Sequence, residues 1–373
     1  MSEFQGRPYF PSLTGLRAIA ALVVLFTHVE RYRQLTGRDL MMPYANSSFA
    51  GSLAVTFFFV LSGFLITSLL LAEKSQRGTI RIGAFLYKRW RRIWPLYYTV
   101  LAAGYGVSIF LLKSTPADPL ENGVFLNILL LPNIAFAFGL IPDILIQIWS
   151  VGTEEQFYLI WPFLVRRSPA KPLAINLCRI IAGALVLRLI VHLVMPGADW
   201  LNIILYRTRI DCMASGGLFA LLLLHKDRNT RLLRCYQVAI HPFTGWVCMA
   251  GFLLAFYLSV RYGVGLYPVY MFLSGILMIR VIVKPVGFLE WAPVKYLGKI
   301  SYGIYLLHNF AIFSLYGCLP SLTRYFDRSP WGDLGVFVLT VVLTVIAAAI
   351  SYRWLESPFL RKRNKSSSDS IPS

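Results

Sequence analysis

Residues 50–72 read AGSLAVTFFFVLSGFLITSLLLA and contain no charged side chain. A helix that crosses the hydrocarbon core of a bilayer needs about 20 predominantly apolar residues. This stretch meets that requirement, so it predicts a transmembrane helix. The neighbouring stretches 12–30 and 93–112 are also predominantly apolar.

The composition of the whole chain favours the same class of protein. Hydrophobic residues make up 57% of the 373 residues and charged residues 14%, against about 45–50% and about 25% in soluble domains. The net charge is +19, which in a soluble protein would suggest nucleic-acid binding. Here most basic residues fall in short gaps between apolar stretches, as the positive-inside rule predicts. We therefore expect a protein of the lipid bilayer with no nucleic-acid partner.

Stretches long enough to cross a membrane recur along the chain. They occur at 12–30, 50–72, 93–112, 147–165, 173–196, 203–224, 239–260, 266–283, 299–318 and 334–354. A further apolar stretch, 122–139, is interrupted by Asn127, Pro132, Asn133 and Gly139. The predicted fold class is an all-α polytopic membrane protein with about ten transmembrane helices and one re-entrant or interfacial segment.

The basic residues between these stretches predict the topology. They include Lys74, Arg77, Arg81, Lys88, Arg89, Arg91, Arg92, Arg166, Arg167, Lys171, Lys226, Arg228, Arg231, Arg234, Lys284, Lys295, Lys299, Arg361, Lys362, Arg363 and Lys365. Ten crossings place all of them, and both termini, on the cytoplasmic side. A full crossing at 122–139 would move the later clusters outside. We therefore expect residues 122–146 to form a re-entrant or interfacial segment on the extracytoplasmic side.

This topology predicts a multi-pass protein of the cell (inner) membrane. We expect one membrane-embedded domain over residues 1–361 and a disordered, serine-rich cytoplasmic tail over 362–373. The 5 cysteines form no close pairs, so neither a disulfide framework nor a zinc site is predicted.

Ionisable residues inside an apolar stretch are candidates for a functional site because they are costly in a membrane. Arg17 and His28 are eleven positions apart in the stretch 12–30. That separation is about three helical turns, or about 16 Å, so both side chains project from one face. The alternatives are a snorkelling arginine near the cytoplasmic end and a hydrogen-bonded structural histidine near the outer end. The shared face favours a joint function.

Two adjacent carboxylates, Glu154 and Glu155, lie near the start of the stretch 147–165. Adjacent residues are about 100° apart on a helix, so the two side chains cannot reach one point. Glu154 shares a face with Ser150 and Tyr158, and we expect it to point inward. The alternative is a pair of acids that complements the helix dipole.

Arg89 and Arg92 belong to the basic cluster that precedes Trp94 and Pro95. A basic cluster with tryptophan often anchors a helix at the cytoplasmic interface. Arginines at i and i+3 also suit bidentate binding of a phosphate. Both interpretations remain open.

Two further sets of polar residues fall in later apolar stretches. Arg209 and Asp211 are two positions apart, so they do not face each other on a helix and each needs a partner elsewhere. Ser301, Tyr305 and His308 form an i, i+4, i+7 stripe, with His308 either a core polar residue or part of an active site. Isolated residues, which we interpret as structural, are Arg188, His192 and Arg280.

These segments together resemble the acyltransferase 3 family of integral membrane O-acyltransferases. The matching features are LTGLR at 13–17 with His28, FFFVLSGFLI at 57–66, Arg89 and Arg92 before Trp94-Pro95, SVGTEEQFY at 150–158, Arg209 with Asp211, LGKISYGIYLLH at 297–308, and ESP at 356–358. The resemblance covers nearly the whole chain. Two departures are Thr14, where the family often has Asp, and Gly152-Thr153 in place of Ser-Val.

The resemblance implies transfer of an acyl group, with acetyl expected, from cytoplasmic acyl-CoA to a hydroxyl of a glycan, a lipid-linked saccharide or another acceptor. An alcohol is a poor nucleophile, so a positioned histidine has to remove its proton. We assign that role to His28, with Glu154 and Arg17 as further catalytic residues. Glu154 either orients the imidazole or binds sugar hydroxyls.

Cationic contacts are needed for the phosphates of acyl-CoA, and we assign them to Arg89 and Arg92. Residues expected to bind the substrate or support the site are Glu155, Arg209, Asp211, Ser301, Tyr305 and His308. Neither a permanently bound cofactor nor a metal is expected. The alternative function is a transporter or exporter, which also buries charged residues, but no pair of matching halves is visible in the sequence.

Overall fold

The computed structural model describes residues 3–4, 7–8, 10–38, 41, 47–111, 119–195, 197–228, 230–262, 266–319, 323 and 330–361. The expected tail, 362–373, lies outside these residues. The described part is helical apart from two short antiparallel strands, β1 (Glu3–Phe4) and β2 (Arg7–Pro8).

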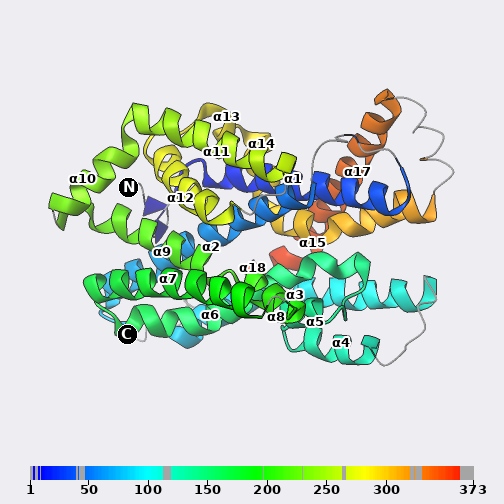
Figure 1. The fold of residues 1–373 in the computed structure, drawn as a ribbon, viewed down its shortest axis with the longest axis horizontal. Helices are drawn as coiled ribbons and strands as arrows, with labels where there is room; N and C mark the ends of the chain where they lie inside the picture. The colour runs from blue at the N-terminus through cyan, green and yellow to red at the C-terminus, as the bar shows by residue number, and fades with distance from the viewer. Residues whose placement is uncertain are drawn as a thin grey trace, which may run out of the picture.

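Most of the longer helices run roughly parallel to one another and form a bundle, and α17 (Pro330–Ser351) runs obliquely to them (Figure 1). Up to residue 194 the chain forms α1 (Leu13–Leu35), α2 (Ser47–Arg77), α3 (Ile82–Gly106), the π-helix η1 (Val107–Leu111), α4 (Pro119–Ile128), α5 (Pro132–Ala137), the 3₁₀-helix η2 (Asp143–Ile148), α6 (Trp149–Arg167) and α7 (Ala170–Val194). It continues with α8 (Asp199–Thr208), α9 (Ile210–His225), the 3₁₀-helix η3 (Lys226–Arg228), α10 (Thr230–Ile240), α11 (Pro242–Tyr262) and α12 (Tyr267–Val283). The remaining elements are α13 (Gly287–Glu290), α14 (Ala292–Lys299), α15 (Ser301–Ile312), the π-helix η4 (Phe313–Cys318), α17 (Pro330–Ser351), the π-helix η5 (Tyr352–Glu356) and α18 (Ser357–Arg361).

Six helices in the described part are long and apolar enough to cross a membrane. They cover Leu13–Leu35, Ala50–Arg77, Ile82–Leu111, Ala170–Val194, Pro242–Ser259 and Trp331–Leu360. α12 is apolar but has only 17 residues. The expected number of about ten is therefore not confirmed, although the all-helical class is. Within the expected stretch 299–318, the 12-residue α15 changes at Phe313 to the π-helix η4.

The stretch 203–224, expected as one helix, is also divided. Arg209 has a left-handed backbone with φ of 44° and separates α8 from α9. Its guanidinium donates to the Tyr206 carbonyl within its own segment and to Ser52 and Thr56 on α2. The expectation of one continuous span here is wrong, because the left-handed backbone at Arg209 interrupts the helix, and the Arg209 side chain bonds to α2 at this point.

The segment expected to be re-entrant or interfacial forms short helices. α4 has 10 residues and α5 has 6, so each is about 15 Å long or less and cannot cross a bilayer alone. Both lie at one end of the bundle, and α10 lies at the opposite end (Figure 1).

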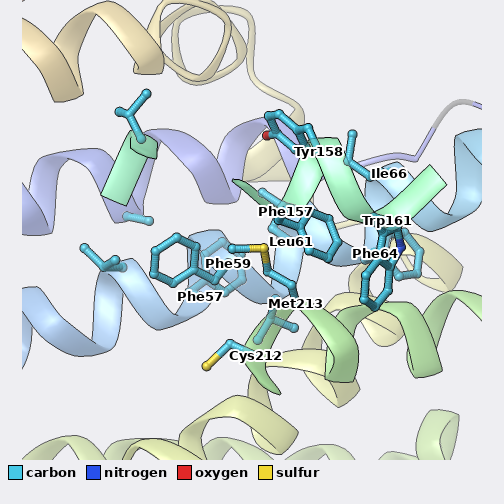
Figure 2. Packing of buried hydrophobic residues seen from close by; sticks show 14 of the residues in the cluster. Phe57, Phe59, Leu61, Phe64, Ile66, Phe157, Tyr158, Trp161, Cys212 and Met213 are labelled. Carbon is cyan, nitrogen blue, oxygen red and sulfur yellow. The ribbon is translucent and has the colours of Figure 1, made fainter. Parts of the chain in front are cut away.

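α2 is the central helix of the bundle. The apolar part of α2 is 78% buried, against 17% for α7 and 22% for α11 and α17. α2 packs against α1, α6, α9, α11 and α12. Figure 2 shows the resulting core, in which Phe59 and Leu61 of α2 meet Phe157 of α6 and Met213 of α9. The less buried helices present their apolar side chains outward, as expected for contact with lipid.

Two glycines allow the backbones of α2 and α9 to touch. A methyl group at Gly63 would lie 1.9 Å from the carbonyl oxygen of Met213, and one at Gly216 would lie 2.0 Å from that of Val60. Membrane helices use small residues in this way, because close backbone contact replaces the hydrophobic driving force that water supplies elsewhere. The contact therefore fixes α9 against the central helix.

We expect Gly63→Ala to destabilise the protein. At an unobstructed helical position this change stabilises by about 0.5–1 kcal/mol, whereas forcing a methyl group into a packed interior costs about 1–3 kcal/mol. Gly183→Ala in α7 is the matched control, because nothing lies within 4 Å of the added carbon. Thermal unfolding of the purified full chain should show a lower Tm for Gly63→Ala only. A Tm equal to that of the wild type would contradict the close packing.

Candidate active site

A cavity of about 400 Å³ opens among α1, α2, α6, α8 and α15, with α5 and η2 at its edge. We call it the large cavity. It is lined by Thr27, His28, Arg31, Gly51, Ser52, Val55, Phe136, Ile146, Trp149, Tyr206, Arg207 and Tyr305. These residues combine a histidine, two arginines, several hydroxyl groups and aromatic rings, which suits a polar ligand with a ring to stack.

His28 is the titratable base of the large cavity. Its Nδ1 lies 2.9 Å from the carbonyl oxygen of Val24, one helical turn earlier in α1. A carbonyl only accepts, so Nδ1 carries the proton and Nε2 keeps a free lone pair in the neutral ring. Among the described residues no side chain donates a hydrogen bond to that Nε2. The arrangement leaves His28 able to accept a proton from a bound molecule.

His308 lies directly behind His28. The two rings meet edge to face with centroids 4.7 Å apart. His308 is fully buried, its Nδ1 lies 3.3 Å from the Ile304 carbonyl oxygen, and its Nε2 has no hydrogen-bond partner in the described structure. His308 lines neither cavity described here, so it supports the His28 ring from the side of α15.

A second, narrow cavity of about 70 Å³ adjoins the first. Its lining comprises Arg17, Val55, Phe58, Phe59, Ser150, Val151, Glu154, Ser301, Tyr302 and Tyr305. Val55 and Tyr305 line both cavities. The Tyr305 hydroxyl donates to the Gln147 carbonyl at 3.1 Å and lies 2.7 Å from Ser150 Oγ. Tyr305 is therefore held in place where the two cavities meet.

Arg17 and Glu154 both line the narrow cavity, although no ion pair joins them within the described residues. Glu154 Oε2 accepts a hydrogen bond of 2.7 Å from Tyr158, and the Nε of Arg17 is buried without a partner in the described part of the chain. Glu155 points elsewhere: it accepts a bond of 3.1 Å from Trp94 and is 2% exposed. Of the two adjacent carboxylates, Glu154 therefore faces the narrow cavity and Glu155 faces Trp94 on α3.

Arg89 and Arg92 line neither cavity but lie close to the narrow one. The guanidinium of Arg89 lies over the rings of Phe85 and Tyr158, at 5.4 and 5.8 Å from their centroids. Arg89 and Arg92 are both close enough to Arg17 for their positive charges to repel its positive charge. Arg17, Arg89 and Arg92 therefore form one positively charged group, beside which Glu154 supplies the negative charge.

Arg209 and Asp211 lie behind the wall of the large cavity. Asp211 binds Arg188 through two hydrogen bonds of 2.7 and 2.9 Å, so Arg188 is its partner and not an isolated residue. The Arg209 side chain contacts the rings of Tyr206 and Tyr267 at 4.1 and 4.7 Å. Because Tyr206 lines the cavity and Arg209 does not, this network positions the wall without reaching a bound molecule.

Ser301 opens into the narrow cavity with a buried hydroxyl that has no partner in the described structure. The stripe of Ser301, Tyr305 and His308 on α15 therefore spans from the narrow cavity to His28. Asn309 follows it and donates to Gln147 at 2.6 Å, which ties α15 to η2.

The sequence reasoning missed Arg207. Its guanidinium lies 4.3 Å from the ring centroids of both Phe136 and Trp149, inside the large cavity. The signal was present, since Arg207 and Arg209 are both ionisable residues within the apolar stretch 203–224. Arg207 reaches the cavity and Arg209 bonds to α2 because the helix breaks at Arg209. The periodicity of the sequence does not predict this break. Among the described residues no group of three or more His, Cys, Asp or Glu side chains is placed to hold a metal.

Comparison with known proteins gives one family for nearly the whole chain. The Acyl_transf_3 family, described as an acyltransferase domain, matches residues 10–353. The peptidoglycan O-acetyltransferase OatA of Listeria monocytogenes is 27% identical over 379 residues, which is 94% of this chain and 56% of the relative. YrhL of Bacillus subtilis, provisionally named a peptidoglycan O-acetyltransferase, is 28% identical over 386 residues, 95% of this chain and 55% of the relative. The chain thus spans about half the length of these relatives, and no solved structure matches it significantly.

Proposed function

Because the chain belongs to the Acyl_transf_3 family of acyltransferases, we propose that it is a membrane O-acetyltransferase. It moves an acetyl group from cytoplasmic acetyl-CoA to a hydroxyl group of a glycan. Acetyl as the acyl group is supported by relatives that are named O-acetyltransferases. Peptidoglycan, which the name of the Listeria relative gives as its acceptor, is the model for the acceptor class.

His28 provides the main support for this chemistry. Its Nδ1 is bound to a main-chain carbonyl, and it lines the larger of two cavities that meet at Val55 and Tyr305. The free Nε2 takes the proton from the acceptor hydroxyl while the hydroxyl oxygen attacks the thioester carbonyl carbon. The carbon–sulfur bond then breaks, and the leaving thiolate receives the proton from the imidazolium. No permanently bound cofactor takes part.

The narrow cavity suits the donor. Acyl-CoA carries its charge on phosphates, and Arg89 and Arg92 bind them at the cytoplasmic end, where arginine can hold a phosphate with two parallel bonds. The uncharged thioester arm then reaches the narrow cavity, whose volume of about 70 Å³ favours a short acyl group. Arg17, whose buried Nε has no partner there, polarises the thioester carbonyl.

The carboxylate of Glu154 partly neutralises the charge of Arg17, Arg89 and Arg92, and it accepts a hydrogen bond from Tyr158. A carboxylate near three arginines lowers the cost of keeping them in the membrane. Glu155, Arg209, Asp211, Ser301, Tyr305 and His308 then support the site by positioning its walls. The acceptor enters the large cavity from the extracytoplasmic side, and both termini are cytoplasmic in a multi-pass protein of the inner membrane. A transporter is not favoured, because the family match is to acyltransferases.

We expect His28→Ala to lower acetyl transfer by roughly 10²–10⁴-fold, the usual contribution of a positioned base. Acetyl esters formed on the acceptor should be counted per folded molecule, so that a loss of yield is not mistaken for a loss of turnover. His192→Ala is the matched control, because His192 is exposed on α7. If His28→Ala turns over at a normal rate, this mechanism is wrong and His308 becomes the next candidate base.

The double variant Arg89→Ala/Arg92→Ala should bind acetyl-CoA at least tenfold more weakly, since each charged hydrogen bond contributes about 1.5–3 kcal/mol. Lysine at both positions should restore little, because it lacks the planar fork. The exposed pair at the end of α6, Arg166 and Arg167, gives a control with the same loss of charge. Titration of the purified protein with acetyl-CoA measures the affinity. Equal affinities for both double variants would limit Arg89 and Arg92 to anchoring the helix.

A further inference from the structure

Arg207 lies against two aromatic rings at the wall of the large cavity. It is the next-to-last residue of α8, and its guanidinium carbon lies 4.3 Å from the ring centroids of Phe136 on α5 and Trp149 on α6. The Arg207 carbonyl also accepts a bond of 3.1 Å from Thr153. Contact with two aromatic rings restrains the guanidinium and leaves its N–H edge available.

That edge has no partner in the described part of the chain. Arg207 makes no hydrogen bond or ion pair through its side chain there, whereas Arg188 binds Asp211 and Arg209 binds Ser52 and Thr56. A charge held inside a membrane protein normally has a partner, because an isolated charge is costly in a medium of low dielectric constant. The half-buried guanidinium of Arg207 is thus placed to pair with a negative group of a molecule bound in the cavity.

The large cavity itself offers no such group. None of its lining residues is a carboxylate, and the other arginine among them, Arg31, has Asp143 at 3.5 Å on the exposed rim. The Arg31 side chain is 42% exposed and that of Asp143 77%, so this pair is weak. The cavity thus contains two cations besides His28. Arg31 is paired with Asp143 at the exposed rim, and Arg207 has no side-chain partner in the described part of the chain.

We infer that the large cavity binds an acceptor glycan that carries a negative group, a carboxylate or a phosphate, and that Arg207 forms the ion pair with it. That the ligand is an acceptor rests on the proposed function. The inference adds the chemical class of that acceptor. Arg207 acts in binding and specificity: the charged group orients the sugar so that one hydroxyl faces Nε2 of His28. Neutral glycans lack this anchor.

The test uses the purified full chain in nanodiscs of phosphatidylcholine and three oligosaccharides of equal length. One is a neutral oligomer of N-acetylglucosamine, the second alternates N-acetylglucosamine with glucuronic acid, and the third is the neutral oligomer with one phosphate. Calorimetry measures the affinity for each. We expect the wild type to bind at least one charged oligosaccharide about 10–100-fold more tightly than the neutral one. Preference for the second points to a sugar carboxylate, and preference for the third to a phosphate.

Arg207→Gln should remove this preference and leave binding of the neutral oligosaccharide within about threefold of the wild type. Arg31→Gln is the matched control, because it removes the same charge from the exposed rim of the same cavity; it should reduce the preference by less than about threefold. An equal loss in both variants would show a general charge effect and overturn the assignment to Arg207.

Equal affinity of the wild type for all three oligosaccharides, or binding of none, overturns the inference without any variant. Acetyl transfer to the same oligosaccharides is measured separately, with acetyl-CoA present. Esters formed equally on neutral and charged glycans would support the acetyltransferase and overturn the charged acceptor. Charge-selective binding with no ester on any glycan would overturn the acetyltransferase and leave the binding assignment in place.

Discussion

Gly63 and Gly216 bring the backbones of α2 and α9 into direct contact, and the wall that α8 gives to the large cavity depends on that contact. α9 begins directly after Arg209, whose guanidinium binds Ser52 and Thr56 on α2. With α9 fixed against α2, the break at Arg209 directs α8 across the large cavity. Arg207, near the end of α8, then meets the rings of Phe136 and Trp149.

The cost of burying charge explains how the rest of the polar interior is arranged. Asp211 and Arg188 neutralise each other through two bonds, and Arg209 is satisfied by hydroxyl and carbonyl oxygens. Near the narrow cavity, Arg17 keeps a buried donor without a partner in the described structure. Ser301, which lines the same cavity, also keeps a buried hydroxyl without a partner in the described structure, and a bound donor would give both groups a partner.

Helical periodicity predicted the local geometry of the site but not its partners. The spacing of Arg17 and His28 predicts that both side chains lie on one face of α1. In the structure they line two cavities that meet at Val55 and Tyr305. The 100° between Glu154 and Glu155 separates them, with only Glu154 at the narrow cavity. Pairing of Arg188 with Asp211 depends on how α7 packs against α9, which no local pattern contains. The break at Arg209 was missed because apolar composition continues across it.

Transfer between the two cavities is most directly tested by separating donor and acceptor with a membrane. The full chain is reconstituted in sealed vesicles with labelled acetyl-CoA on the side of Arg89 and Arg92 and a carboxylated oligosaccharide on the other side. Neither compound crosses the bilayer unaided. We expect labelled acetyl ester on the oligosaccharide in the opposite compartment. Ester formation only when both compounds share one compartment would contradict it.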